Sequence, residues 1–289
     1  MKINDFVLLN NGIKMPIFGF GTYQIKNRDV MRKCLDCALE HGYRVIDTAS
    51  VYKNEIHIGE FLPELLKKHN LSRQDVFITT KLSPKDLGRD ETRKAIQDSL
   101  TKLKLDYVDL YLIHWPGKQG LRREDMKNAV FRAESWKSLE DVYTETNQLR
   151  SIGVSNYTVK HLEELLSNCC IVPAVLQSEF HPDYQQNDIV ELCKQKNIHF
   201  TSYSSLGQGR LVEDSRLLPY AEKYGKNVPQ ILLRWALQKG CSVIPKSCDT
   251  SRIVENSDIF DFTLTASDMG EIGNLGKCMK YAWNADDVA

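Results

Sequence analysis

RVIDTA (44–49), VFITTKL (76–82) and VDLYLIH (108–114) are three short apolar runs, rich in β-branched residues, that decide the fold. Each run has the length of a buried strand, and amphipathic stretches with helical spacing separate one run from the next. Strands that alternate with helices predict parallel strands joined by right-handed crossovers. The three runs therefore indicate an α/β fold in which the strands share one direction.

The same alternation continues on both sides of these runs. Five further strands are expected at FGFGTY (18–23), RSIGVSN (150–156), AVLQSEF (174–180), HFTSYSSL (199–206) and CSVIPKS (241–247). Helices are expected at 30–41, 54–69, 90–103, 134–148, 158–167, 187–196, 214–224, 228–239, 251–256 and 266–275. Apolar stretches on both sides of Asn11-Gly12 predict a hairpin before the first strand. Eight strand–helix units favour a closed (β/α)8 TIM barrel over an open doubly wound sheet.

Composition excludes several classes of partner. The chain is 42% hydrophobic and 26% charged, and its 38 basic and 38 acidic residues give zero formal net charge. A neutral chain gives no reason to expect a nucleic acid or a membrane surface as partner. The start of the chain lacks the apolar core of a signal peptide, no run could span a membrane, and no linker divides the sequence. We expect one domain over 1–289 and a cytoplasmic monomer.

The eight cysteines predict neither a disulfide framework nor a metal site. Disulfide scaffolds are short and loop-rich, and the cysteine spacings match no zinc motif. Cys34 and Cys37 form a C-x-x-C pattern, which could be a redox pair. Their surroundings have helical apolar spacing without a turn that would expose a thiol, so we favour two buried helix residues.

Four polar residues stand at, or a few residues beyond, the ends of three adjacent predicted strands: Asp47, Tyr52, Lys81 and His114. Reduction of a carbonyl needs a hydride donor, a proton donor and stabilisation of the developing oxyanion. Tyr52 could donate the proton if a nearby ammonium lowered its pKa from about 10. Lys81 is the candidate ammonium, Asp47 its counter-ion, and His114 could orient the carbonyl.

Each of these residues has a simpler explanation when it is taken alone. Asp47 could cap a helix, Tyr52 and Lys81 could be packing or surface residues, and His114 could be a core histidine. Their joint position at the ends of three successive strands is more specific. Active sites of (β/α)8 barrels lie at the rim formed by the carboxyl ends of the strands, so the four residues predict a reductase site.

The cofactor region is predicted partly by what the sequence lacks. No G-x-G-x-x-G opens a helix after the first strand, and no P-loop motif is present. A barrel can instead bind phosphate at the loops after its seventh and eighth strands, where IPKSCDTSRIVEN (244–256) lies. Lys246, Ser247 and Arg252 offer an ammonium, a hydroxyl and a guanidinium at the start of a helix. A capped helix with a solvated basic face is the alternative.

Three ordered motifs resemble the signatures of the aldo-keto reductases, and the resemblance covers nearly the whole chain. The motifs are GYRVIDTASVYKNEIHIG (42–59), RSIGVSNY (150–157) and IPKSCDTSRIVEN (244–256). Shorter matches lie between them at GFGTY (19–23), HWP (114–116), LQSEFHP (176–182) and YSSLGQGRL (203–211). The resemblance implies a (β/α)8 barrel that binds NADP(H) across its carboxyl-end rim and reduces aldehydes and ketones.

The resemblance also implies roles for individual residues. Tyr52 would be the general acid, Lys81 and Asp47 would lower its pKa, and His114 would orient the carbonyl. The implied cofactor contacts are Gly21, Thr22, Tyr23 and Asp47 near the nicotinamide end, Ser155, Asn156 and Gln177 on the carboxamide, Tyr203 stacked on the ring, Ser204 and Leu206 at the pyrophosphate, Lys246, Ser247 and Arg252 at the 2′-phosphate, and Glu255 and Asn256 near the adenine.

The substrate is less closely defined. Tyr23 and Trp115 should form an aromatic wall beside Tyr52 and His114, and the loop from Trp115 to about 133 and the tail 279–289 should set specificity. The short tail favours small aldehydes and dicarbonyls over bulky sterols. Two other functions stay open. One is a nucleotide-binding sensor or accessory barrel without turnover, and the other is a Schiff-base lyase with a lysine nucleophile.

Overall fold

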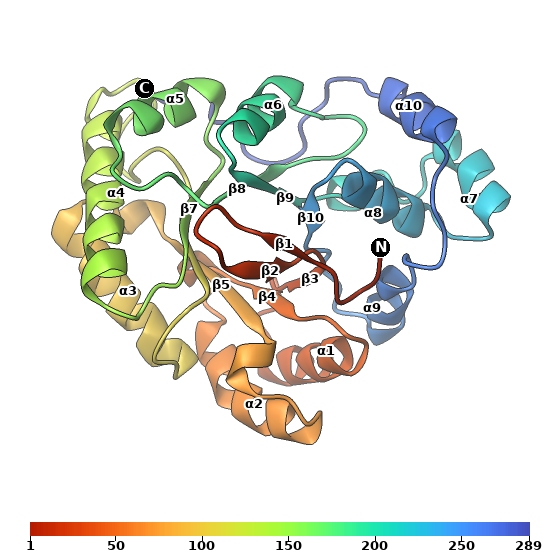
Figure 1. Ribbon diagram of the computed structural model, residues 1–289, viewed down its shortest axis with the longest axis horizontal. Helices are drawn as coiled ribbons and strands as arrows, with labels where there is room; N and C mark the ends of the chain where they lie inside the picture. The colour runs from red at the N-terminus through yellow and green to blue at the C-terminus, as the bar shows by residue number, and fades with distance from the viewer.

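Eight parallel strands form the centre of the computed structural model, which describes every residue from 1 to 289 (Figure 1). They are β3 (Gly19–Gly21), β4 (Val45–Asp47), β5 (Phe77–Leu82), β6 (Leu110–Ile113), β7 (Ile152–Ser155), β8 (Val175–Glu179), β9 (His199–Tyr203) and β10 (Ser242–Val243). Each strand pairs in parallel with the next one along the chain. The predicted (β/α)8 fold is confirmed.

The barrel closes between its two edge strands, β3 and β10. The N–H of Val243 donates to the carbonyl of Ile17 at 3.0 Å, and the N–H of Gly21 donates to that of Pro245 at 3.0 Å. A Cβ at Gly21 would lie 2.7 Å from the carbonyl oxygen of Ile244, so a side chain at this position would push the two edges apart. Because β10 has only two residues, few backbone hydrogen bonds hold this seam.

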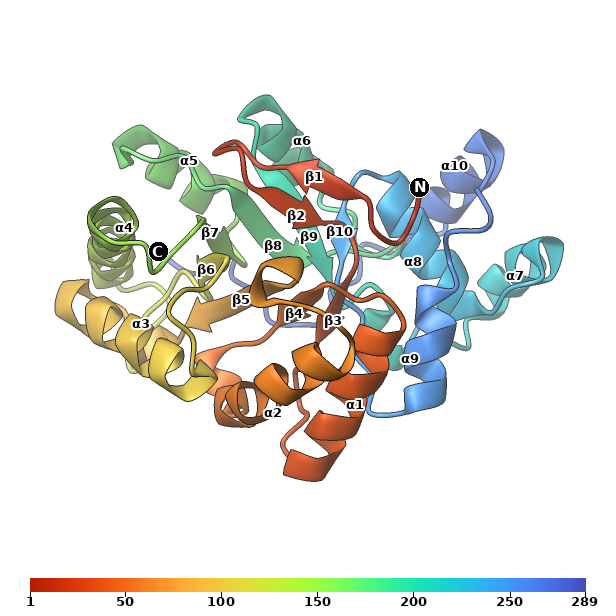
Figure 2. The same ribbon diagram turned by 60° about the horizontal axis from the view of Figure 1, so that its bottom comes forward.

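The predicted hairpin covers the amino-terminal end of the barrel. Its strands are β1 (Phe6–Leu8) and β2 (Lys14–Pro16), which pair antiparallel around Gly12 at a φ of 83°. Figure 1 looks onto this hairpin, and Figure 2 shows it from the side. Its Leu9 and Met15 belong to the small core inside the barrel, which also contains Val45, Phe77, Leu110, Leu112, Ala174, Val175 and Ile244.

Ten helices surround the barrel and bury a larger core against the outer faces of the strands (Figures 1 and 2). They are α1 (Arg28–Glu40), α2 (Glu55–Lys68), α3 (Arg89–Leu103), α4 (Lys127–Glu145), α5 (Val159–Asn168), α6 (Asn187–Gln195), α7 (Leu218–Tyr224), α8 (Val228–Gln238), α9 (Thr250–Ser257) and α10 (Ala266–Asn274). Cys34 and Cys37 lie on the buried face of α1, as predicted. None of these helices has the length and apolar character that a membrane crossing requires.

The largest boundary error concerns α4, which begins at Lys127 and not at the predicted residue 134. Its first turn exposes Val130, and its start signal is weak: Asp125, two residues before the helix, accepts from the N–H of Lys127 at 2.9 Å. The side chain of Asn128, the second residue of α4, ties this turn to the preceding loop. It accepts from the N–H of Lys118 at 2.9 Å and donates to the carbonyl of Arg122 at 2.9 Å. The loop after β6 is therefore shorter than expected.

Candidate active site

Asp47 and Lys81 form a buried ion pair at the carboxyl ends of β4 and β5. The ammonium of Lys81 lies 2.5 Å from Oδ1 of Asp47 and donates to the carbonyl of Thr48 at 2.8 Å. The second carboxylate oxygen of Asp47 accepts from Nε2 of Gln177 at 2.8 Å. Burial lowers the pKa of Lys81 below its usual range, and the charge of Asp47 opposes that shift. The pair holds one positive charge at a fixed place beneath the rim.

Tyr52 stands beside this pair, at the end of the short 3-10 turn Ser50–Tyr52. Its ring centroid is 5.1 Å from Nζ of Lys81 and 5.6 Å from the ring centroid of His114. Burial, followed by the charge of Asp47, raises the pKa of Tyr52 well above 10. The net shift is thus opposite to the expected lowering, because burial and the charge of Asp47 outweigh the ammonium of Lys81, which is itself paired with Asp47. The phenol keeps its proton at neutral pH.

His114 follows β6 directly and is buried, with 5% of its surface exposed. Burial, followed by the charge of Lys81, lowers the pKa of His114 well below 6.5, so its imidazole is neutral at physiological pH. Its Nδ1 has no hydrogen-bond partner, and the ring lies beside the phenol of Tyr52. A neutral imidazole can donate one hydrogen bond to a ligand without carrying charge into the pocket.

A cleft of about 680 Å³ opens above these residues and runs along the carboxyl-end rim of the barrel. Most of the predicted site residues line it: Gly21, Tyr23, Asp47, Tyr52, His114, Ser155, Asn156, Gln177, Tyr203, Ser204, Leu206, Lys246, Ser247, Arg252, Glu255 and Asn256. Lys81 and Thr22 lie beneath this surface. Thr22 donates its N–H and its hydroxyl to the carbonyl of Asp47, at 3.0 and 2.9 Å, so it supports the strand end.

The far end of the cleft is basic and lies at the start of α9. Lys246 and Arg252 line the cleft there, and neither side chain pairs with a carboxylate, unlike Lys223 and Lys226 nearby. Asp249 caps α9 by accepting from the N–H of Ser251 at 2.9 Å. Unpaired cations beside a helix start are a suitable site for a phosphate group. The residues present therefore fit a phosphorylated nucleotide at this end.

Comparison with known proteins agrees with this geometry. The sequence model of the aldo/keto reductase family matches residues 17–277. The chain belongs to the aldo-keto reductase family. Members of this family are oxidoreductases that use NADP(H), and this chain is therefore an NADP-dependent oxidoreductase that reduces carbonyl groups.

Individual aldo-keto reductases are similar over almost their full length. Glyoxal reductase of Bacillus subtilis is 41% identical over 99% of this chain and 98% of its own. Methylglyoxal reductase of Escherichia coli is 40% identical over 93% of this chain and 92% of its own. The crystal structure of a Bombyx mori aldo-keto reductase in complex with NADP has a TM-score of 0.87 at 34% identity, with 97% of this chain and 95% of that one covered.

Side chains from β7 to β9 form one wall of this aldo-keto reductase cleft. Tyr203 donates from its hydroxyl to Oδ1 of Asn156 at 2.6 Å. Nδ2 of Asn156 donates to the carbonyl of His114 at 2.9 Å and to the hydroxyl of Ser155 at 3.1 Å. Asn156 has a φ of 62°, a conformation that asparagine tolerates better than most residues. These contacts join the predicted nicotinamide residues to the backbone of His114.

Trp115 is not part of the main cleft, contrary to the prediction. It lines a neighbouring cavity of about 320 Å³ that it shares with Trp283. Trp283 lies between the two cavities, 54% exposed, with its ring centroid 6.3 Å from that of His114 and 6.2 Å from that of Trp115. The aromatic residues that line the main cleft beside Tyr52 and His114 are Tyr23 and Trp283, and Trp115 lies behind Trp283.

Sequence reasoning placed specificity in the tail but did not select Trp283. The lone tryptophan of the tail was the available signal, because an exposed aromatic residue in a polar segment often contacts a ligand. Of the other lining residues, five lie inside the motifs at 203–211 and 244–256 but were not selected individually, and the rest lie in loops, in the tail or at the start of α8. These other lining residues are Gln24, Ser205, Gln208, Gly209, Val212, Glu213, Asn227, Pro229, Ile244, Pro245 and Ala282.

Proposed function

We propose that this enzyme uses NADPH to reduce small aldehydes and dicarbonyls to alcohols, with Tyr52 as the general acid. The observation that carries the proposal is a protonated phenol and a neutral imidazole, Tyr52 and His114, on one cleft whose other end holds unpaired cations. The names of the similar glyoxal and methylglyoxal reductases support the substrate class. The short tail, which favours small carbonyl substrates over bulky sterols, agrees with that class.

Bound NADPH would supply the hydride that the carbonyl carbon accepts. Tyr52 gives its hydroxyl proton to the carbonyl oxygen as charge develops there, and a proton from water later restores the phenol. His114 donates a hydrogen bond to the same oxygen and so fixes the direction of the carbonyl. The ammonium of Lys81, 5.1 Å from the ring of Tyr52, stabilises the phenolate that remains.

We further propose how the chain binds the cofactor. Gln177 already gives Nε2 to Asp47, so its Oε1 remains to accept from the nicotinamide carboxamide. Lys246 and Arg252 have no internal partner, so they can pair with the 2′-phosphate. The remaining proposed contacts are Ser155 and Asn156 at the carboxamide, Tyr203 on the ring, Gly21, Thr22 and Tyr23 in the first loop, Ser204 and Leu206 at the pyrophosphate, Ser247 at the 2′-phosphate, and Glu255 and Asn256 at the adenine.

The test measures NADPH oxidation with glyoxal, methylglyoxal and one bulky steroid ketone, by the loss of cofactor absorbance. We expect turnover with both dicarbonyls and a kcat/KM for the steroid that is lower by about 100-fold or more, the scale of about 3 kcal/mol in substrate discrimination. A parallel titration measures NADPH affinity by fluorescence. Tight cofactor binding without consumption of any carbonyl would reject the proposal in favour of a sensor or accessory barrel.

A further inference from the structure

A fully buried carboxylate outside the cleft binds the tail of the chain. Glu179 ends β8, is 0% exposed and does not line the cleft. Its Oε1 accepts from the N–H of Tyr281 at 2.7 Å and from Nε2 of His181 at 2.9 Å, and its Oε2 accepts from the N–H of Ala282 at 2.9 Å. Three donors thus satisfy a charge that the barrel would otherwise bury at high cost.

The same short segment of the tail is bound on its other side. The ring of Tyr281 stacks on His181 with centroids 5.1 Å apart, and its hydroxyl donates to Oδ2 of Asp183 at 2.7 Å. The N–H of Met279 donates to the carbonyl of Asp183 at 2.7 Å. Residues 279–282 are therefore tied to the segment that follows β8, and not to a helix of the outer ring.

Trp283 is the residue that this attachment places. It follows Ala282 directly, and its indole lines the cleft without any hydrogen bond of its own. Its contacts with His114 and Trp115 are aromatic contacts at centroid distances above 6 Å. The backbone at 281–282, whose two N–H groups Glu179 accepts, fixes the indole from its amino-terminal side. On the other side, the carbonyl of Asn284 accepts from Arg123 at 3.4 Å.

We propose that Glu179 is a positioning residue of the substrate pocket. Its carboxylate holds the amides of Tyr281 and Ala282, so that Trp283 closes the pocket beside His114. This inference rests on the proposed function in one respect, since the property that it alters is the binding of the carbonyl substrate. Loss of the carboxylate should free the tail and raise KM for that substrate, while Tyr52 and the cation site for the cofactor stay in place.

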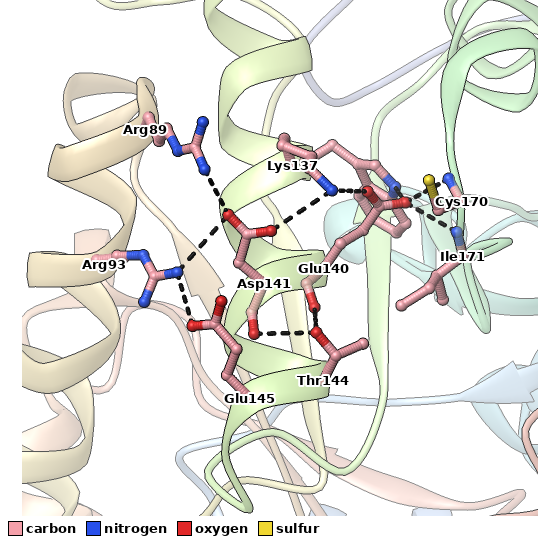
Figure 3. A network of polar contacts seen from close by, with 10 residues as sticks. Arg89, Arg93, Lys137, Glu140, Asp141, Thr144, Glu145, Cys170 and Ile171 are labelled. Atoms are coloured by element: carbon pink, nitrogen blue, oxygen red, sulfur yellow. Dashed lines mark hydrogen bonds and ion pairs between the residues drawn. The ribbon is translucent and has the colours of Figure 1, made fainter.

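The chain contains a matched control for this arrangement. Glu140 on α4 is 3% exposed, and its Oε1 accepts from the N–H groups of Cys170 and Ile171 at 2.6 and 2.8 Å (Figure 3). It also accepts from Nε1 of Trp136 at 3.1 Å. Like Glu179, it is a buried carboxylate that binds two consecutive amides, but none of its partners lines the cleft.

The experiment compares E179Q with E140Q. In E179Q an amide NH2 replaces one acceptor oxygen, so one backbone N–H loses its partner. E140Q removes the same charge and the ion pair of Oε2 with Lys137, and its remaining oxygen can keep both backbone amides. We expect both variants to melt at lower temperature. We expect only E179Q to raise KM for methylglyoxal, by about tenfold, with NADPH affinity within about a factor of two of the wild type. An equal rise of KM in both variants, or none in E179Q, would overturn the proposal.

One further measurement does not depend on turnover. Hydrogen exchange of a peptide covering 279–283 should become faster in E179Q and stay unchanged in E140Q. Unchanged exchange in E179Q would overturn the proposal that Glu179 holds the tail. If the wild-type protein reduced no carbonyl, the proposed function would fail while exchange still decided the role of Glu179. If E179Q does not fold, A282P serves in its place, because proline has no N–H to donate to Glu179 and the carboxylate stays. Exchange of 279–283 should again become faster.

A double variant separates positioning from general damage. W283A should raise KM to a similar extent as E179Q, because both remove the indole from its place. E179Q/W283A should show little further rise, since the second change removes a contact that the first has already lost. Additive effects of the two substitutions would contradict a role that acts through Trp283.

Discussion

Gln177 donates from Nε2 to Oδ2 of Asp47 at 2.8 Å, although β8 and β4 lie four places apart in the barrel. This hydrogen bond crosses the mouth of the barrel. The other oxygen of Asp47 lies 2.5 Å from the ammonium of Lys81. Both oxygens of the carboxylate are therefore engaged, and the site for Tyr52 is built on contacts from opposite walls.

Removal of one charge from this pair should destabilise the fold. We expect K81M to lower the free energy of unfolding by about 3–5 kcal/mol, because it leaves the carboxylate of Asp47 buried without a counter-ion. D47N/K81M should recover much of that loss, since neither charge remains. Urea unfolding of the two variants measures the difference. A double variant as unstable as K81M would show that the packing of the lysine, and not the unpaired charge, dominates.

The proposed acid has its own test. Y52F removes only the hydroxyl, and we expect kcat/KM for methylglyoxal to fall by about 10²–10⁴ with NADPH affinity nearly unchanged. Y157F is the control, because the hydroxyl of Tyr157 is buried without a partner and Tyr157 does not line the cleft. It should leave the rate close to that of the wild type. Substantial activity in Y52F would mean that another group donates the proton.

Cofactor selectivity tests the basic end of the cleft. R252Q should weaken NADPH binding by about 1.5–3 kcal/mol, the usual range for a hydrogen bond to a charged group, which is about 10- to 150-fold in Kd. NADH lacks the 2′-phosphate and should bind with little change. Fluorescence titration with both cofactors measures the two affinities. Equal losses would place Arg252 elsewhere on the cofactor.

Stability should depend on pH through two buried histidines, His114 and His161, and the half-buried His199. Burial lowers the pKa of His161 and of His199 to about 4 and holds that of His114 well below 6.5. Below about pH 6.5 the unfolded chain takes up protons that the folded chain refuses, so the free energy of unfolding should fall with falling pH, until pH reaches the folded pKa values. Three such groups can remove up to about 4 kcal/mol per pH unit.

The variant H199Q isolates one of these groups. It removes one titrating imidazole, whose Nε2 lies 2.7 Å from the hydroxyl of Ser242. The slope of unfolding free energy against pH between 6 and 5 should then decrease by about one proton, or about 1.4 kcal/mol per pH unit. Urea unfolding at a series of pH values measures the slope. An unchanged slope would show that His199 is protonated alike in both states.

The barrel and the ends of its strands were predictable because their signals are local. Asp47 and His114 lie next to apolar runs whose length and composition mark strands, and the order of the runs defines the rim. The start of α4 was not predictable in this way. Its first turn is held by contacts of Asn128 with residues of the preceding loop, and no local pattern reports such contacts.

The properties that the sequence could not predict arise between distant residues. The pKa of Tyr52 depends on how completely the surroundings exclude water and on which group Lys81 faces, and the residue types alone do not reveal either. The position of Trp283 in the cleft has the same kind of origin. It follows from two hydrogen bonds to Glu179, which is about a hundred residues away from the tail along the chain.

The seam between β3 and β10 links the closure of the barrel to its ligand. The cleft touches Gly21 on one side of the seam and Ile244, Pro245 and Lys246 on the other. A molecule bound there would bridge the two edges that the backbone itself joins with few hydrogen bonds. Because the nucleotide binds only the folded barrel, it should raise the free energy of unfolding as its concentration rises. Its concentration in the cell would then affect how long the folded chain survives proteolysis.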